Sequence, residues 1–120
     1  MNKILIVGCG SIGSRHLQSL SNTNTEIEIY VIDNNEGSLN NAKSIFERMP
    51  LNDLIHCVKY YDSLEDINFD IDLAIIATNS DVRKRVVKEI YSKIRVKYLI
   101  LEKVAFQSVK CFEEVINLIN

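Results

Sequence analysis

The chain has 120 residues, a length that allows one domain with one sizeable hydrophobic core. Hydrophobic residues make up 47% of the chain and charged residues 25%, which is typical of a folded globular protein and excludes a disordered or fibrous one. The formal net charge of -2 provides no overall positive field to attract nucleic acid or an anionic membrane surface. No apolar run approaches the roughly 18 residues needed to cross a bilayer, and the first run is too short for a signal peptide. We therefore predict a cytoplasmic protein.

Short aliphatic runs alternate with segments of helical periodicity along the chain. The aliphatic runs predict strands at residues 4–7, 27–32, 54–58, 71–77 and 98–101. The periodic segments predict helices over residues 11–20, 39–49, 82–94 and 112–119, and residues 61–66 suit a turn or a short helix. Such alternation implies right-handed crossovers between parallel strands. We therefore predict a single α/β domain over residues 1–120, with a doubly wound parallel sheet of about five strands.

A glycine-rich motif lies between the first predicted strand and the first predicted helix. Residues 8–13 read Gly-Cys-Gly-Ser-Ile-Gly, which is the G-x-G-x-x-G pattern of a Rossmann domain. The first glycine permits a tight turn, the second lets the backbone approach a diphosphate, and the third lets the helix pack closely on the strand. The positive end of the helix dipole then stabilises the diphosphate, and a serine hydroxyl adds a hydrogen bond. The residues expected to bind the cofactor here are Gly8, Gly10, Ser11, Ile12 and Gly13.

An acidic residue, Asp33, follows the second predicted strand, at the position where a carboxylate can accept hydrogen bonds from the adenosine ribose. Asp33 would repel the 2'-phosphate of NADP, and no Arg or Lys occurs in residues 34–42 to offset it, so NAD is the predicted cofactor. Two alternatives remain at this point. In the first, the glycines form only a tight turn and Asp33 starts an Asx turn. In the second, the ligand is S-adenosylmethionine, whose folds rarely show this glycine spacing.

Three segments in order, residues 3–20, 61–83 and 99–113, resemble the N-terminal domain of the glucose-fructose oxidoreductase, inositol dehydrogenase and MocA family. The resemblance implies that Thr78 and Asn79 border the nicotinamide ribose and that Glu102 lies beside the nicotinamide. It also implies that Lys103 orients the substrate as the catalytic cation. These residues follow predicted strands, whose carboxyl ends are where open α/β sheets bind ligands. From the residues alone, Glu102 and Lys103 also suit a solvated pair at a strand end.

The chain departs from the family at several places. Arg83 stands where the family has a His, and Val104 where it has a Pro. The resemblance implies a second domain that supplies most substrate contacts, and we expect these 120 residues to lack it. We therefore predict the cofactor half of a sugar, nucleotide-sugar or polyol dehydrogenase, inactive alone and self-associating through the face that its partner domain would cover. The alternative is a stand-alone or degenerate nucleotide-binding module without catalysis.

Other residue types that often carry chemistry are interpreted as structural. The three cysteines are Cys9, Cys57 and Cys111. Their wide spacing predicts reduced thiols, with neither a disulfide framework nor a metal site. His16 and His56 are interpreted as structural histidines. The basic run in residues 83–97 suits a solvated helix face, and it predicts no nucleic-acid partner because no aromatic residues interleave with the charges.

Overall fold

The computed structural model describes residues 1–101, apart from the side chains at positions 11, 12, 80 and 81. Five strands form one parallel sheet in the order β3-β2-β1-β4-β5. The strands are β1 (Asn2–Val7), β2 (Ile27–Ile32), β3 (Ile55–Tyr61), β4 (Ile71–Ile76) and β5 (Val96–Leu101). The doubly wound parallel sheet predicted from the sequence is thus confirmed. The helix predicted over residues 112–119 lies outside the described residues.

The three central strands are buried on both faces because their sequences are almost continuous aliphatic runs. In β1, Leu5 and Ile6 are fully buried although they point to opposite faces of the sheet. In β2, Ile29 and Val31 are likewise fully buried. Most positions of these strands are therefore apolar, and the buried Tyr30 directs its hydroxyl to the Glu28 carboxylate of the same strand.

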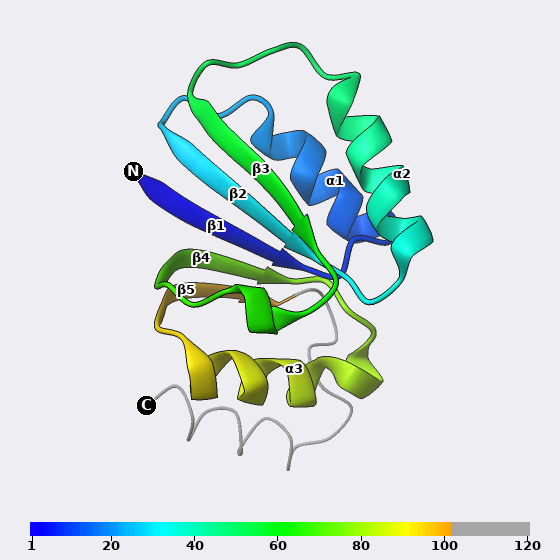
Figure 1. Ribbon diagram of the computed structural model, residues 1–120, viewed down its shortest axis with the longest axis vertical. Helices are drawn as coiled ribbons and strands as arrows, with labels where there is room; N and C mark the ends of the chain where they lie inside the picture. The colour runs from blue at the N-terminus through cyan, green and yellow to red at the C-terminus, as the bar shows by residue number, and fades with distance from the viewer. Residues whose placement is uncertain (102–120) are drawn as a thin grey trace.

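The helices cover the sheet on both sides (Figure 1). Helices α1 (Ser11–Leu20) and α2 (Glu36–Glu47) lie on one face, and α3 (Ser80–Lys93) lies on the other, together with the short helix η1 (Leu64–Asp66). Each face has its own hydrophobic core, one around Ile6 and the other around Leu5. The chain moves outward from β1 to β3 and then returns to β4, so the strand order reverses between β1 and β4. Open α/β sheets bind ligands at this reversal.

Among the described strands and α-helices, two boundaries differ from the predicted ones by three residues, and the others differ by at most two. Helix α2 begins three residues earlier than predicted, because the Asn35 side chain caps it by accepting a hydrogen bond from the Ser38 N–H at 3.0 Å. Strand β3 continues to Tyr61, which pairs with Ile32. It ends in Lys59, Tyr60 and Tyr61 and not in an aliphatic run, which suits an edge strand whose side chains are partly buried or exposed.

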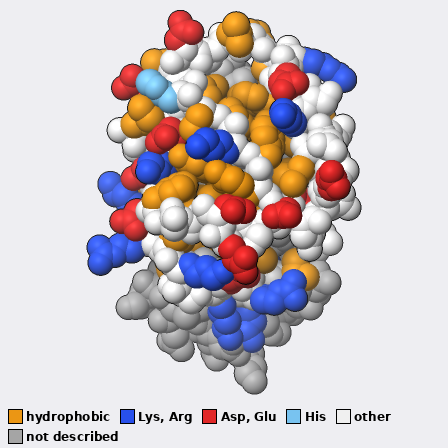
Figure 2. All heavy atoms as spheres, viewed as in Figure 1, with side chains coloured by type: hydrophobic (Ala, Val, Ile, Leu, Met, Phe, Trp, Pro, Cys, Tyr) orange, Lys and Arg blue, Asp and Glu red, His pale blue; other side chains and the backbone are white. Residues whose placement is uncertain are grey.

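The surface combines apolar and charged areas. On the face in Figure 2, hydrophobic side chains gather near the middle, and acidic and basic side chains are interspersed around them. On the edge strand β5, Tyr98 and Ile100 are 62% and 42% exposed. Within residues 1–101, no helix is both long and apolar enough to span a membrane.

Candidate functional site

A cavity of about 490 Å³ lies at the carboxyl edge of the sheet. It is lined by the residues that follow β1, β2, β3 and β4, and by one side of α3. The cavity therefore extends across four neighbouring strand ends and includes the place where the strand order reverses. Among the residues expected at the site, Gly8, Gly10, Asp33, Thr78 and Asn79 line this one cavity.

The glycine motif adopts a conformation that only glycine accommodates. Gly8 has a φ of 90°, and a Cβ added there would lie 3.0 Å from the backbone of Ala77 and Thr78. A Cβ on Gly13 would overlap the carbonyl oxygen of Gly8, so the start of α1 lies directly against the loop. A Cβ on Gly10 would have no heavy atom within 4 Å and would point into open space. Two glycines thus serve the packing, and Gly10 leaves room for a ligand.

The start of α1 differs from the start of α2. Helix α2 has an Asn35 cap and Glu36 in its first turn, so its free N–H groups and dipole are partly compensated. Helix α1 begins after Gly10, with no side-chain cap and no acidic residue in its first turn. Its free N–H groups and the positive end of its dipole therefore lie at the cavity, and no described side chain of the helix caps them. This arrangement suits a diphosphate.

Asp33 connects the end of β2 to the glycine loop. One carboxylate oxygen accepts a hydrogen bond from the Cys9 N–H at 2.9 Å and a longer one from the Cys9 thiol at 3.5 Å. The other oxygen accepts from the Asn35 N–H at 2.8 Å. These bonds fix the orientation of a carboxylate that remains partly exposed at the cavity.

Cys9 is buried and Cys57 is half-buried, and both are free thiols, in agreement with the prediction of structural thiols. Burial and the neighbouring negative charge of Asp33 raise the pKa of the Cys9 thiol to about 12. The thiol therefore stays protonated at neutral pH, donates to the carboxylate and is a poor nucleophile. Cys111 lies outside the described residues.

The loop after β4 is held by a buried arginine. Arg83 is 4% exposed, and its guanidinium donates a hydrogen bond to the carbonyl oxygen of Thr78 at 2.6 Å. The interpretation of the basic run as a solvated face is therefore wrong for Arg83, which turns inward at the start of α3. The Thr78 hydroxyl is buried and has no hydrogen-bond partner among the described residues, so a polar group remains available beside the cavity.

The cavity also contains residues that the sequence motifs did not indicate. Asp62 and Ser63 follow β3, and Arg85 and Glu89 project from α3. The signal for Asp62 was present, because the carboxyl end of β3 must lie at the same edge of the sheet as those of β1 and β2. Residue Arg85 had no such signal, since the contacts of a helix face depend on how the helix packs.

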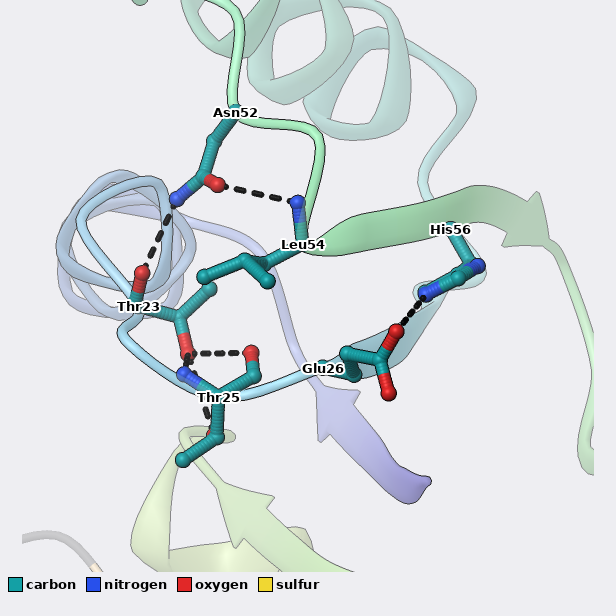
Figure 3. A network of polar contacts seen from close by, with 6 residues as sticks. All are labelled: Thr23, Thr25, Glu26, Asn52, Leu54 and His56. Carbon is teal, nitrogen blue, oxygen red and sulfur yellow. Dashed lines mark hydrogen bonds and ion pairs between the residues drawn. The ribbon is translucent and has the colours of Figure 1, made fainter.

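Gly13 does not line the cavity itself, and several other expected site residues lie outside the described part of the chain. Glu102 and Lys103 fall beyond residue 101, and the side chains of Ser11 and Ile12 are not among those described. His16 and His56 do not line the cavity. The imidazole of His56 lies 3.2 Å from the carboxylate of Glu26 at the opposite end of the sheet (Figure 3). Among the described side chains, no group of three or more His, Cys, Asp or Glu residues is arranged to hold a metal.

The parallel sheet, the glycine loop at the uncapped start of α1 and the acidic residue after β2 define a dinucleotide-binding domain of the Rossmann type. The chain belongs to the Gfo/Idh/MocA oxidoreductase family. The model of this family, described as an oxidoreductase family with an NAD-binding Rossmann fold, matches residues 2–120. The predicted family and the predicted cofactor, NAD, are thereby confirmed.

Two solved structures share this fold. An oxidoreductase from Agrobacterium radiobacter, solved in complex with NAD+, L-tartaric acid and magnesium, matches with a TM-score of 0.69 and 16% identity over 98% of this chain. A diketoreductase matches with a TM-score of 0.60 and 19% identity over 84% of this chain. This chain spans only 32% and 41% of the lengths of those two proteins. Among curated proteins, none matches the sequence of this chain.

Proposed function

We propose that this chain is the cofactor-binding part of an NAD-dependent dehydrogenase acting on a sugar, a nucleotide sugar or a polyol. One observation carries the proposal. The uncapped start of α1, the open space at Gly10 and the oriented carboxylate of Asp33 all border a single cavity at the sheet reversal. These are the groups that a dinucleotide needs for its diphosphate and its ribose.

The residues at the cavity suggest how the cofactor would lie. The N–H groups around Gly10 and Gly13 would receive the diphosphate, together with the predicted contacts of Ser11 and Ile12. Asp33 has acceptor capacity beyond its internal bonds and would accept hydrogen bonds from the adenosine ribose. Thr78 and Asn79, after β4, would border the nicotinamide ribose, where the buried Thr78 hydroxyl needs a partner. Glu102 would lie beyond them, at the nicotinamide.

The charges at the cavity favour NAD over NADP. Asp33, Asp62 and Glu89 contribute three negative charges, and Arg85 contributes the one positive charge among the described lining side chains. A 2'-phosphate next to Asp33 would be repelled at short range. Arg85 lies on α3, whereas Asp33 is fixed by the loop between β1 and α1, so compensation by Arg85 would require it to reach across the cavity.

Catalysis by this cofactor part would depend on additional protein. Bound NAD supplies hydride transfer, and Lys103 would orient the substrate hydroxyl. Because the two fold relatives are far longer than this chain, we propose that a second domain supplies the substrate contacts and excludes water. The exposed Tyr98 and Ile100 on β5 suit a surface that a partner domain or a second copy covers. A cytoplasmic location remains part of this proposal.

A second function, a nucleotide-binding module without catalysis, is favoured by Arg83. This residue stands where the family has a His, and it serves the loop after β4 rather than a substrate. In a longer protein that contains the second domain, the dehydrogenase proposal predicts that Lys103→Ala abolishes turnover without weakening NAD binding. A module without catalysis would show no turnover before or after this change.

The test is a calorimetric titration of the 120-residue chain with NAD and with NADP, repeated for Asp33→Ala. We expect NAD to bind more tightly than NADP and Asp33→Ala to reduce this preference, because the variant removes the repulsion of the 2'-phosphate. Asp53→Ala, which removes an exposed carboxylate outside the cavity, serves as the matched control. Equal preference in the wild-type chain and in Asp33→Ala would contradict the role of Asp33, and absence of binding would contradict the proposal as a whole.

A further inference from the structure

The cavity continues past Asp33 to the loop after β3. There, Leu64 lies on one side, and Val82 and Val86 of α3 contribute further apolar surface. The carboxylate of Asp62 lines the same region and is exposed. Among the described residues, no hydrogen bond or ion pair engages Asp62, in contrast to Asp33 with its internal donors. The region therefore combines apolar walls with one free acceptor.

The order of the strands indicates which part of a dinucleotide would reach this region. The diphosphate site follows β1, and the adenosine ribose site at Asp33 follows β2. The next strand outward is β3. In adenosine, the group attached to the ribose on the side away from the diphosphate is the base. A flat, largely apolar base suits the walls formed by Leu64, Val82 and Val86.

We propose that Asp62 determines specificity for adenine by accepting a hydrogen bond from its exocyclic amino group. This inference rests on the proposed NAD-binding function. An ionised carboxylate can only accept hydrogen bonds, so it suits the amino group of adenine. The oxo group that hypoxanthine carries at the same position would face the carboxylate acceptor to acceptor. Hypoxanthine also carries an N1–H where adenine has an acceptor, but this donor lies beside the oxo group and not in place of the amino group. The site should therefore bind the hypoxanthine dinucleotide more weakly than NAD.

Arg85 has a different role at the same cavity. Its exposed guanidinium lies one helical turn before Glu89 on the side of α3 that lines the cavity. A guanidinium can cover the π face of a purine without distinguishing the substituents at its edge. Loss of Arg85 should therefore weaken binding of both dinucleotides by a similar factor. Arg85→Ala thus separates base stacking from reading of the amino group.

The experiment compares NAD with nicotinamide hypoxanthine dinucleotide by calorimetric titration of the 120-residue chain. The wild-type chain should bind NAD at least about tenfold more tightly, as expected for a hydrogen bond to a charged group. In Asp62→Asn, the ratio should fall to within about threefold, because an amide can present either its oxygen or its NH2 group to the base. Asp62→Ala should weaken binding of NAD but not of the hypoxanthine dinucleotide. Asp66→Asn, at an exposed acid outside the cavity on the same segment, should leave the ratio unchanged.

The outcomes separate this inference from the proposed function. If the wild-type chain binds both dinucleotides equally well, or if Asp62→Asn and Asp62→Ala keep the wild-type ratio, the role of Asp62 is overturned while NAD binding stands. If neither dinucleotide binds, the proposed function and this inference are both overturned. Unchanged circular dichroism and urea midpoints in the variants would establish that a changed ratio arises at the site and not from unfolding.

Discussion

The two ends of the sheet treat their polar groups differently. At the amino end, the Asn52 side chain donates to the carbonyl oxygens of Ser21 and Thr23 and accepts from the Leu54 N–H, each at 3.0 Å. Figure 3 shows the bonds to Thr23 and Leu54. At the carboxyl end, the Thr78 hydroxyl has no partner among the described residues, and the start of α1 has no cap. Folding therefore satisfies the polar groups around Asn52 at one end, whereas at the other it leaves the Thr78 hydroxyl and the start of α1 without a described side-chain partner. Substitutions at the amino end should change stability, and those at the open part of the carboxyl end should change binding.

The largest expected effect comes from a glycine that belongs to the packing although it lies at the carboxyl end. Gly13→Ala would place a Cβ on top of the carbonyl oxygen of Gly8, and only a shift of α1 away from the glycine loop would relieve this overlap. We expect a loss of about 3 kcal/mol in the free energy of unfolding, at the upper end of the range for overpacking. Urea unfolding monitored by circular dichroism measures this loss.

Gly10→Ala is the matched control, because its Cβ meets no heavy atom within 4 Å. Its stability should stay within about 1 kcal/mol of the wild type, the cost of a poorer helix cap. Its affinity for NAD should fall roughly tenfold or more, because the methyl group occupies the space for the diphosphate. Equal stability of Gly13→Ala and Gly10→Ala would contradict this division between packing and binding.

Arg83 provides the next largest effect. Arg83→Ala removes a buried, charge-assisted hydrogen bond to Thr78 and should cost about 2 to 3 kcal/mol of unfolding free energy. The loop that carries Thr78 and Asn79 should also relax, so NAD should bind more weakly. Arg85→Ala, two residues further along the same helix, is the stability control because Arg85 is exposed. Unfolding free energies that match in the two variants would show that Arg83 does not hold this loop.

Asn52 tests the amino end. Asn52→Ala leaves two carbonyl groups and one N–H without their partner, which should cost about 2 kcal/mol of unfolding free energy after water compensates some of them. NAD affinity should be unchanged because Asn52 is remote from the cavity. Asn22→Ala changes an exposed residue in the neighbouring turn and is the control. A weakened NAD affinity in Asn52→Ala would break the distinction between the two ends.

The sequence predicts the sheet well because its signals are local. The aliphatic run in residues 4–7 and the glycine motif after it determine β1, the tight turn and the start of α1 in both the prediction and the structure. Asp33 is likewise indicated by its spacing from the glycines, and the structure places it against Cys9 of that motif. Such features depend on a few neighbouring residues and on the parallel pairing of adjacent strands.

The parts that the sequence did not predict depend on tertiary contacts. Arg83 belongs to a run of basic residues whose composition suits a solvated face, and only the packing of α3 against the loop after β4 buries it. Asp62 follows a strand whose end was predicted too early, because its last residues are only partly buried and lack a continuous apolar pattern. The burial of a single charged side chain and the irregular end of an edge strand leave no periodic signal in a single sequence.

The smallest expected effect concerns Cys9, which has internal partners although it lies at the carboxyl end. The pKa of its thiol is about 12 in the folded chain, against an ordinary value of 9.0, first because of burial and then because of the charge of Asp33. As the pH rises past 9, the thiol ionises in the unfolded chain before it does so in the folded one. The folded state therefore loses stability between pH 9 and pH 12, and the loss is absent below pH 9.

Cys9→Ala lacks this ionisation, so it isolates the effect from other groups such as Tyr60, whose pKa burial also raises to about 12. Between pH 8 and pH 10, the unfolding free energy of the wild type should fall by about 1 kcal/mol relative to that of Cys9→Ala. Urea unfolding of both proteins at the two pH values measures this difference. A constant difference would mean that burial against Asp33 does not raise the pKa of the Cys9 thiol. The Asp33 carboxylate would then be held by the Cys9 and Asn35 N–H groups alone.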